Sequence, residues 1–175
     1  MSKKGGQWER DVCKFLSKWI QGTEKPYIFW RGRGSGGMFT SNNLVGETFA
    51  GDIYNIREEG KFLTDMFVIE CKNGYSGISF DNHLKKLKSD DIEKFWFKVC
   101  EESIKTNKRP MLIYKKKGYK IPWIFISLDF YKKIYKYINN MRYVNLKWID
   151  NECYVFDFYE FFENITPSII KKTKI

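Results

Sequence analysis

The chain has 175 residues, 43% of them apolar, which suits one folded domain with its own core. Its formal net charge is +10, and 25 of its 31 basic residues are lysine, with a net +6 in residues 61–120 alone. This charge points to a polyanionic partner, because neutralised phosphates release counterions. Basicity alone does not separate nucleic acid from an anionic membrane surface or from a need for solubility.

Cysteine spacing and hydropathy exclude several protein classes. A single histidine and four scattered cysteines do not form a zinc framework or a disulfide scaffold. No apolar stretch approaches the roughly 20 residues of a membrane span, and the N-terminus lacks the apolar core of a signal peptide. We therefore expect a soluble protein in a reducing compartment, the cytoplasm of a bacterial, archaeal or virus-infected cell.

The first predicted element is a helix over residues 7–20, where apolar side chains recur every three or four positions and Gly22 ends the pattern. Residues 29–43 follow as a predicted loop. They hold four glycines, with Arg31 and Arg33 beside the first two, and such a stretch does not pack as regular structure.

The middle of the chain alternates strands and a helix. We predict strands at 48–56 and 62–71 around a turn at 58–61, a helix at 88–105, and strands at 111–117 and 122–128 around Gly118. This order indicates an α/β or α+β fold with a mixed central sheet flanked by helices.

Beyond Leu128 the chain is rich in aromatic residues. It predicts a helix at 129–141, a hairpin of 144–150 and 152–158, a short helix at 158–165 and a tail at 168–175. So many aromatic side chains exceed what a small hairpin and helix can bury. We expect a single domain, with a core at 1–128 and an extension at 129–175 that packs on the core or forms a dimer surface.

The segment FVIECKN, residues 67–73, is an apolar run that ends with Glu70 and Lys72. Residues two apart in a strand share a face, so these side chains are expected together at one end of a sheet. Two more carboxylates stand where a charge is costly. Glu9 lies on the apolar flank of the first helix, and Asp52 lies in a strand-like run that could pair beside Glu70.

Such a group suits metal-dependent phosphate hydrolysis. Asp52 and Glu70 would supply oxygen ligands to Mg²⁺, with the backbone carbonyl of Cys71 as a further ligand and Glu9 for a second ion. Lys72 would orient or help deprotonate the attacking water and offset charge in the transition state. The simpler alternative is a surface ion pair between Glu70 and Lys72, with Asp52 in a turn.

The segments WERDVCKFL with Glu9, RGRGSGG, GDI with Asp52 and IECK with Glu70 and Lys72 resemble the PD-(D/E)XK nuclease superfamily. Within it they are most similar to the archaeal-type Holliday-junction resolvases. The resemblance covers roughly residues 3–128.

The resemblance implies a restriction-endonuclease-like sheet, Mg²⁺ or Mn²⁺ dependence and a homodimer acting on branched DNA. It gives metal binding to Glu9, Asp52 and Glu70 and the role of catalytic lysine to Lys72, and it matches Ser35 with a serine near the scissile phosphate. Three features depart from it: Ala50 and Gly51 replace the usual proline, the loop at 38–49 is long, and residues 129–175 have no counterpart.

Basic residues near these segments are candidates for contacts with the DNA backbone. Arg31 and Arg33 lie beside glycines that let a strand approach closely. Lys85, Lys86 and Lys88 could follow DNA that leaves the site, although a solvated face is an equal alternative. For His83 a surface or cap role is favoured over that of a base.

The leading hypothesis is a metal-dependent DNA endonuclease, with the Holliday junction as favoured substrate. The alternatives are a restriction-type or nicking endonuclease, a repair exonuclease, a non-catalytic DNA-binding module, and an interaction protein acting through its aromatic C-terminal region.

Overall fold

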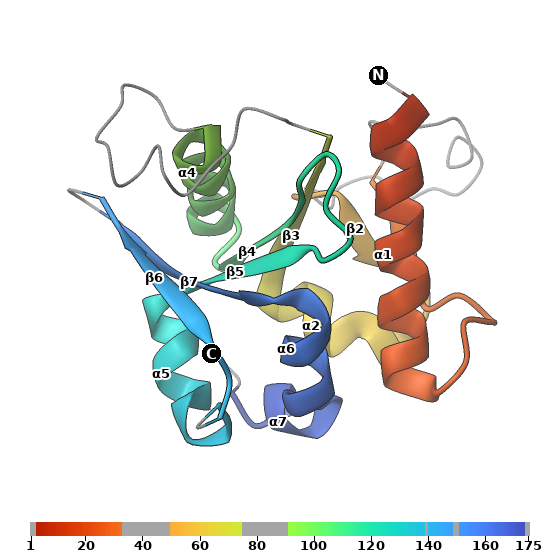
Figure 1. The fold of residues 1–175 in the computed structure, drawn as a ribbon. Helices are drawn as coiled ribbons and strands as arrows, with labels where there is room; N and C mark the ends of the chain where they lie inside the picture. Colours follow the sequence, from red (N-terminus) through yellow and green to blue (C-terminus); the bar gives the residue numbers. More distant parts are fainter. Residues whose placement is uncertain (1–2, 33–49, 75–90, 139, 149–150, 174–175) are drawn as a thin grey trace.

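The computed structural model describes residues 3–32, 50–74, 91–138, 140–148 and 151–173. Its centre is a five-stranded sheet in the order β3-β4-β5-β7-β6 (Figure 1). The strands are β3 (Phe67–Asn73), β4 (Arg109–Lys115), β5 (Trp123–Ser127), β6 (Tyr143–Lys147) and β7 (Glu152–Asp157). β3 and β4 are parallel and the other pairs antiparallel, so the sheet is mixed, as predicted.

A small antiparallel pair lies beside the sheet. It consists of β1 (Phe29–Arg31) and β2 (Ile53–Asn55), and β2 contacts β3. Because β3 is the outermost strand, one row of its backbone groups faces β2 rather than another sheet strand. The two segments that carry Asp52 and Glu70 therefore meet at one edge.

Helices cover both faces of the sheet. On one face lie α1 (Lys3–Gln21), α2 (Lys61–Met66), α5 (Leu128–Ile134), α6 (Phe158–Asn164) and α7 (Pro167–Lys171), whose buried side chains share one cluster. On the other lies α4 (Asp91–Lys105). Two short 3-10 helices, η2 (Glu58–Gly60) and η3 (Tyr135–Tyr137), complete the described elements.

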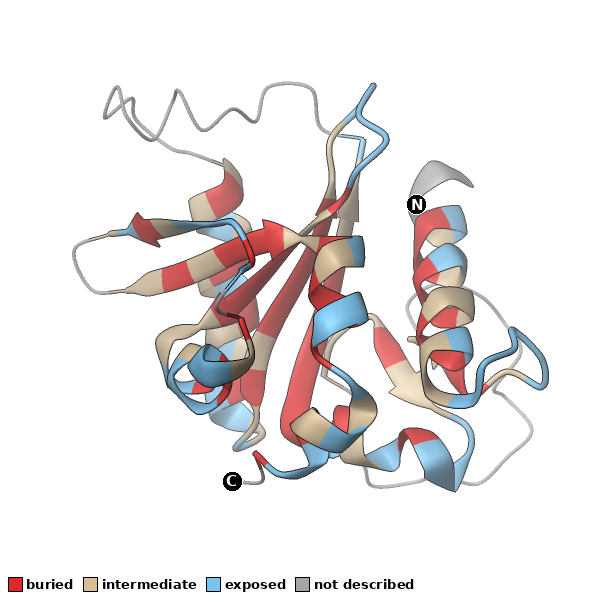
Figure 2. Cartoon of the chain, turned by 60° about the horizontal axis from the view of Figure 1, so that its bottom comes forward, coloured by how far each residue is buried: buried red, intermediate tan, exposed pale blue. Residues whose placement is uncertain are grey.

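Side chains of the strands alternate between the two faces. Ile69 and Cys71 of β3 pack in the cluster on the α1 side, whereas Val68 packs against α4. Glu70 shares the parity of Val68 and therefore faces α4. Figure 2 shows the strands as the buried centre of the molecule, with exposed residues at the turns.

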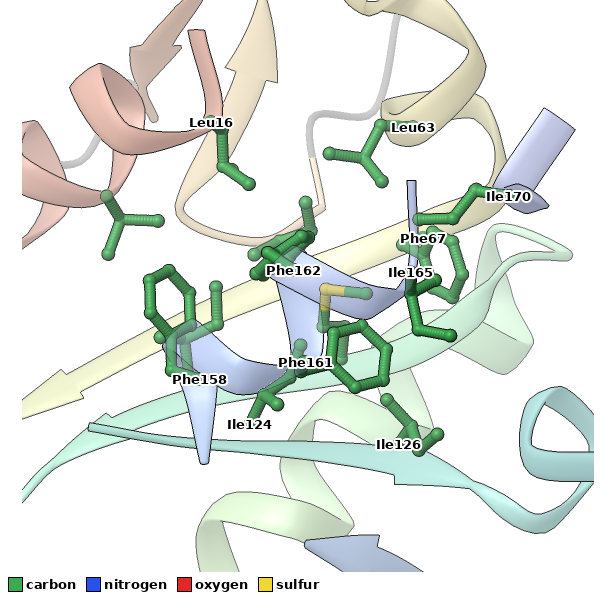
Figure 3. Close-up of a cluster of buried hydrophobic side chains, with 14 of the residues drawn as sticks. Leu16, Leu63, Phe67, Ile124, Ile126, Phe158, Phe161, Phe162, Ile165 and Ile170 are labelled. Atoms are coloured by element: carbon green, nitrogen blue, oxygen red, sulfur yellow. The ribbon is translucent and has the colours of Figure 1, made fainter. Parts of the chain in front are cut away.

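The C-terminal aromatic residues complete the core on the α1 side. Figure 3 shows Phe158, Phe161 and Phe162 of α6 among side chains from other elements, including Leu16 of α1 and Ile124 of β5. Burying each such phenylalanine contributes roughly 1.5–3 kcal/mol.

Four local predictions were wrong. The helix predicted at 129–141 ends at Ile134 as α5, and only η3 follows it, to Tyr137. Residues 62–66 form most of α2 rather than a strand, because Leu63 and Met66 are buried three positions apart, which is a helical spacing. Residues 29–31 form β1 rather than loop. The predicted tail contains α7, which is capped by the Thr166 hydroxyl and begins with Pro167.

Candidate active site

Asp52 is fixed against the free edge of β3. Its backbone N–H donates to the Ile69 carbonyl at 2.7 Å, and its Oδ2 accepts from the Cys71 N–H at 2.8 Å. This approach requires glycine at position 51, where φ is +85° and an added Cβ would lie 2.7 Å from the Ile69 oxygen. The close contact sets the position of Asp52 through the backbone rather than through a flexible side chain.

Glu70 is the buried anion of the site, with 3% of its surface exposed. Its Oε1 accepts hydrogen bonds from Lys72 Nζ and, at 3.2 Å, from Lys98 Nζ of α4. Lys98 also lies 3.5 Å from Glu102, one helical turn further along α4. A buried carboxylate held by two ammonium groups is not a surface ion pair, so the structure removes that alternative for Glu70 and Lys72.

Glu9 reaches the same region from α1. It is buried, and its Oε2 lies 3.7 Å from Nε of Arg31, whose side chain is 11% exposed. No described residue donates a hydrogen bond to that oxygen. Arg31 is thus turned inward toward Glu9, rather than extended into solvent on a loop.

The pKa of Asp52 reflects its burial and the charged groups near it. The pKa of Asp52 is raised to about 7, first by burial, then by the negative charge of Glu70 and, least, by that of Glu9. The Cys71 N–H and the Lys72 ammonium act in the opposite direction and lower the pKa. Ionised Asp52 is therefore disfavoured mainly because it is buried, and in addition because Glu70 lies nearby.

A family model described as "Phage putative PDDEXK endonuclease" matches residues 1–172, almost the whole chain. The chain belongs to this family. Its membership makes the protein a nuclease and confirms the superfamily that residues 3–128 resemble. No curated protein and no solved structure matches the chain significantly.

The PDDEXK family typically uses a divalent metal, and the donor set at the edge of β3 fits one. Asp52 and Glu70 offer carboxylate oxygens, and Glu9 retains a buried oxygen without a hydrogen-bond donor. A cation would also stabilise the ionised form of Asp52, which burial and the charge of Glu70 disfavour. As the side chains stand in the described ranges, no three His, Cys, Asp or Glu residues are gathered into a metal-binding group.

The Cys71 thiol does not belong to the site. It is buried against α1, and burial raises its pKa well above the ordinary value, so a thiolate is disfavoured. Its backbone carbonyl remains the candidate ligand predicted from the sequence.

Several predicted residues lie outside the described part of the chain. They are Ser35, Arg33, His83, Lys85, Lys86 and Lys88. Their roles in catalysis and DNA binding stay predictions.

Lys98 was not predicted as a site residue. Burial is the largest single influence on its pKa and lowers it, but the carboxylates of Glu70, Glu102 and Asp52 together raise the pKa above the ordinary value. The sequence held one usable signal: Lys98 precedes Glu102 by one helical turn and lies beside the apolar stripe of the predicted helix. Its partner Glu70 is 28 residues away, which no local pattern indicates.

None of the helices in the described residues combines the length and apolar character that a bilayer crossing requires.

Proposed function

We propose that this nuclease hydrolyses phosphodiester bonds in DNA with a divalent metal, Mg²⁺ or Mn²⁺, at the edge of β3. The single observation that supports this is the convergence of Asp52 from one segment with Glu70 and Lys72 from β3. Asp52 and Glu70 would be the principal metal ligands, with Glu9 and the Cys71 carbonyl as further ones.

In this mechanism Asp52 and Lys72 have different roles. Asp52 is held by backbone contacts, so its oxygens are oriented before any substrate arrives. Lys72 lies on the same face of β3 as Glu70, where its ammonium would orient the attacking water and offset charge on the phosphate in the transition state. A bound divalent ion supplies polarisation of the phosphate and a water of lowered pKa.

The four-way junction is the substrate that we propose to test first, on the resemblance of residues 3–128 to the resolvases. Paired cuts across a junction need two sites, and hence a homodimer. The outer strand β6, whose Tyr143 and Val144 are exposed, is our candidate surface for the second copy.

The first experiment is a cleavage assay on junction, flap, single-stranded and linear DNA with Mg²⁺ or Mn²⁺. We expect Asp52→Asn, Glu70→Gln and Lys72→Ala each to lower the cleavage rate at least about a hundredfold, since each removes transition-state stabilisation. DNA affinity should survive in all three. The matched controls are Glu163→Gln and Lys133→Ala, at exposed positions on α6 and α5.

The same assay separates the alternatives. Symmetric paired cuts in the junction with intact linear duplex support a resolvase. Equal cutting of both points to a restriction-type or nicking enzyme, and degradation from ends to an exonuclease. If no metal gives cleavage of any DNA, the catalytic proposal fails and a DNA-binding module is favoured.

A further inference from the structure

A hollow of about 380 Å³ opens next to the candidate active site. Residues of the first turns of α1, of the end of β3 and of the turn that joins β4 to β5 line it. Figure 1 shows where these elements lie in the fold. Asn73 pairs in register with Lys115, and the Gly74 N–H donates to the Lys115 carbonyl at 3.1 Å. The hollow therefore begins one residue beyond Lys72.

Its rim is strongly basic. Lys115, Lys116 and Lys117 follow one another into the turn, and no hydrogen bond or ion pair joins their ammonium groups to any described residue. The one acidic group on the rim is Asp11, whose carboxylate accepts a hydrogen bond from the Gln7 amide at 2.8 Å. The charged groups on the rim that lack a hydrogen bond or ion pair are therefore the lysine ammonium groups, which are cationic donors.

The wall supplies a second, independent observation. Trp8 lines the hollow and is 5% exposed, yet its indole N–H finds no acceptor among the described residues. A buried N–H without an acceptor is unfavourable, and an oxygen from a ligand would satisfy it. The Lys115 ammonium lies 5.0 Å from the centre of the same indole ring, so a cation lies over the ring that carries the unused N–H.

These donors select an anion rather than a nucleobase. Both aromatic rings that line the hollow carry a cation: Lys115 lies 5.0 Å from the centre of the buried Trp8 ring, and Lys116 lies 4.8 Å from the centre of the ring of Tyr119, which is 52% exposed. A stacked base would have to displace these ammonium groups, whereas a phosphate would pair with them. The turn leaves room for a chain to approach: Gly74 and Gly118 both have positive φ, and no atom of the described residues lies within 4 Å of a Cβ added at either.

We propose that this hollow binds a backbone phosphate of the DNA that flanks the cleaved bond, through the Trp8 N–H and the ammonium groups of Lys115 and Lys116. The inference rests on the proposed function, because a flanking phosphate presupposes cleavage at the edge of β3. By this proposal, the turn between β4 and β5 positions the DNA strand relative to Lys72.

The test measures binding to DNA in Ca²⁺ or EDTA, with one phosphate at a time replaced by a neutral methylphosphonate. The variant is Lys115→Gln/Lys116→Gln, and the matched control is Lys132→Gln/Lys133→Gln on α5, at exposed positions outside the hollow. We expect the variant to bind about tenfold more weakly than the control near 0.1 M salt, with the slope of log affinity against log salt reduced by about one.

The decisive readout is which phosphate of the DNA weakens binding when it is neutralised. In the wild type and the control, neutralising one particular phosphate should weaken binding, whereas in the Lys115/Lys116 variant the same change should cost little more, because the two losses are not additive. Trp8→Phe, with its fold checked by thermal unfolding, should reduce sensitivity at that same phosphate. Equal affinity of variant and control, with sensitivity at every phosphate unchanged, overturns the proposal.

Three further outcomes distinguish this proposal from its alternatives. If the wild type cuts DNA but no phosphate couples to Lys115 and Lys116, the phosphate site is wrong and the nuclease stands. Coupling without any cleavage supports the phosphate site and removes the catalytic proposal. If millimolar orthophosphate binds the wild type but not the variant, while no phosphate of the DNA couples to Lys115 and Lys116, the hollow is a site for the free anion and its assignment to DNA is wrong.

Discussion

At the scale of single residues, the candidate site holds carboxylates at buried positions, where their charge does not favour folding. Asp52 is partly buried beside Glu70 and Glu9, and its pKa of about 7 shows that the ionised form is unfavourable in the folded chain. Such a cost is expected where a site is built to hold a cation. The same residue should therefore reduce stability while it serves activity.

Asp52→Asn should stabilise the metal-free protein above neutral pH. The folded pKa is about 7 against an ordinary 3.8, so the stability that protonated Asp52 contributes is complete below about pH 4 and is lost as pH rises through 7. Asparagine never ionises and can still accept from the Cys71 N–H. Urea unfolding in EDTA should show the wild type losing roughly 2–4 kcal/mol more than the variant between pH 4 and 8.

The control for this experiment is Asp65→Asn, at an exposed position of α2. It should follow the wild type at both pH values. A wild-type stability that does not fall between pH 4 and 8 in EDTA would contradict the strained position of Asp52.

At the scale of elements, α4 contributes to the site although it carries no predicted ligand. Its apolar stripe packs on β3 and β4, and this packing presents Lys98 to Glu70. Lys98 and a divalent ion would compete for the same carboxylate. The helix thus adjusts the charge of the site from the face of the sheet opposite α1.

Lys98→Met should tighten the binding of Mn²⁺ severalfold, because it removes a positive charge 3.2 Å from Glu70 Oε1. The effect is modest since the Lys98 side chain is 56% exposed and screened by solvent. Lys94→Met is the matched control, because Lys94 lies on the same helix and pairs with Asp91 at 3.8 Å. Calorimetric titration of the three proteins measures the difference, and equal affinities would contradict it.

Another element joins distant parts of the chain. Arg109, at the start of β4, donates to Asp129 at 2.7 Å and to the Thr173 carbonyl at 3.0 Å. This buried arginine holds the segment after α7 against the sheet, where the sequence predicted only a tail. The Thr166-Pro167 start of α7 was a readable local signal, whereas the contact with Arg109 spans 64 residues.

At the scale of the whole molecule, the C-terminal aromatic residues and the first helix form one core. Phe15 of α1 lies 4.6 Å from Phe158 between ring centres, and Trp19 lies 4.9 Å from Phe162. The Trp19 indole N–H donates to the Phe162 carbonyl at 2.9 Å. The helix that carries Glu9 and Trp8 is therefore held partly by residues more than 140 positions away.

A fragment of residues 1–128 should not fold cooperatively. It lacks β6, β7 and α6, so β5 loses its neighbour in the sheet and the apolar side of α1 loses its aromatic cover. In the full chain, Phe162→Ala should cost about 3–5 kcal/mol of stability. Circular dichroism and urea unfolding of both proteins test this, and a sharp unfolding transition of the fragment would contradict it.

The sequence by itself determined the chemical character of this protein. The spacing of Glu70 and Lys72 at the end of an apolar run, with Asp52 after a glycine, predicted a metal-dependent site, and together with Glu9 and the glycine-rich segment it carried the resemblance to the nuclease superfamily. The order of helices and strands predicted the mixed sheet. These predictions were possible because strand periodicity and residue chemistry are local. Tertiary structure decided the rest. The helical form of α2, the contact of Lys98 with Glu70 and the turn of Arg31 toward Glu9 depend on residues far apart in the chain. So does the position of the Lys115 ammonium over the Trp8 ring. Only the packing of the folded chain brings such residues together.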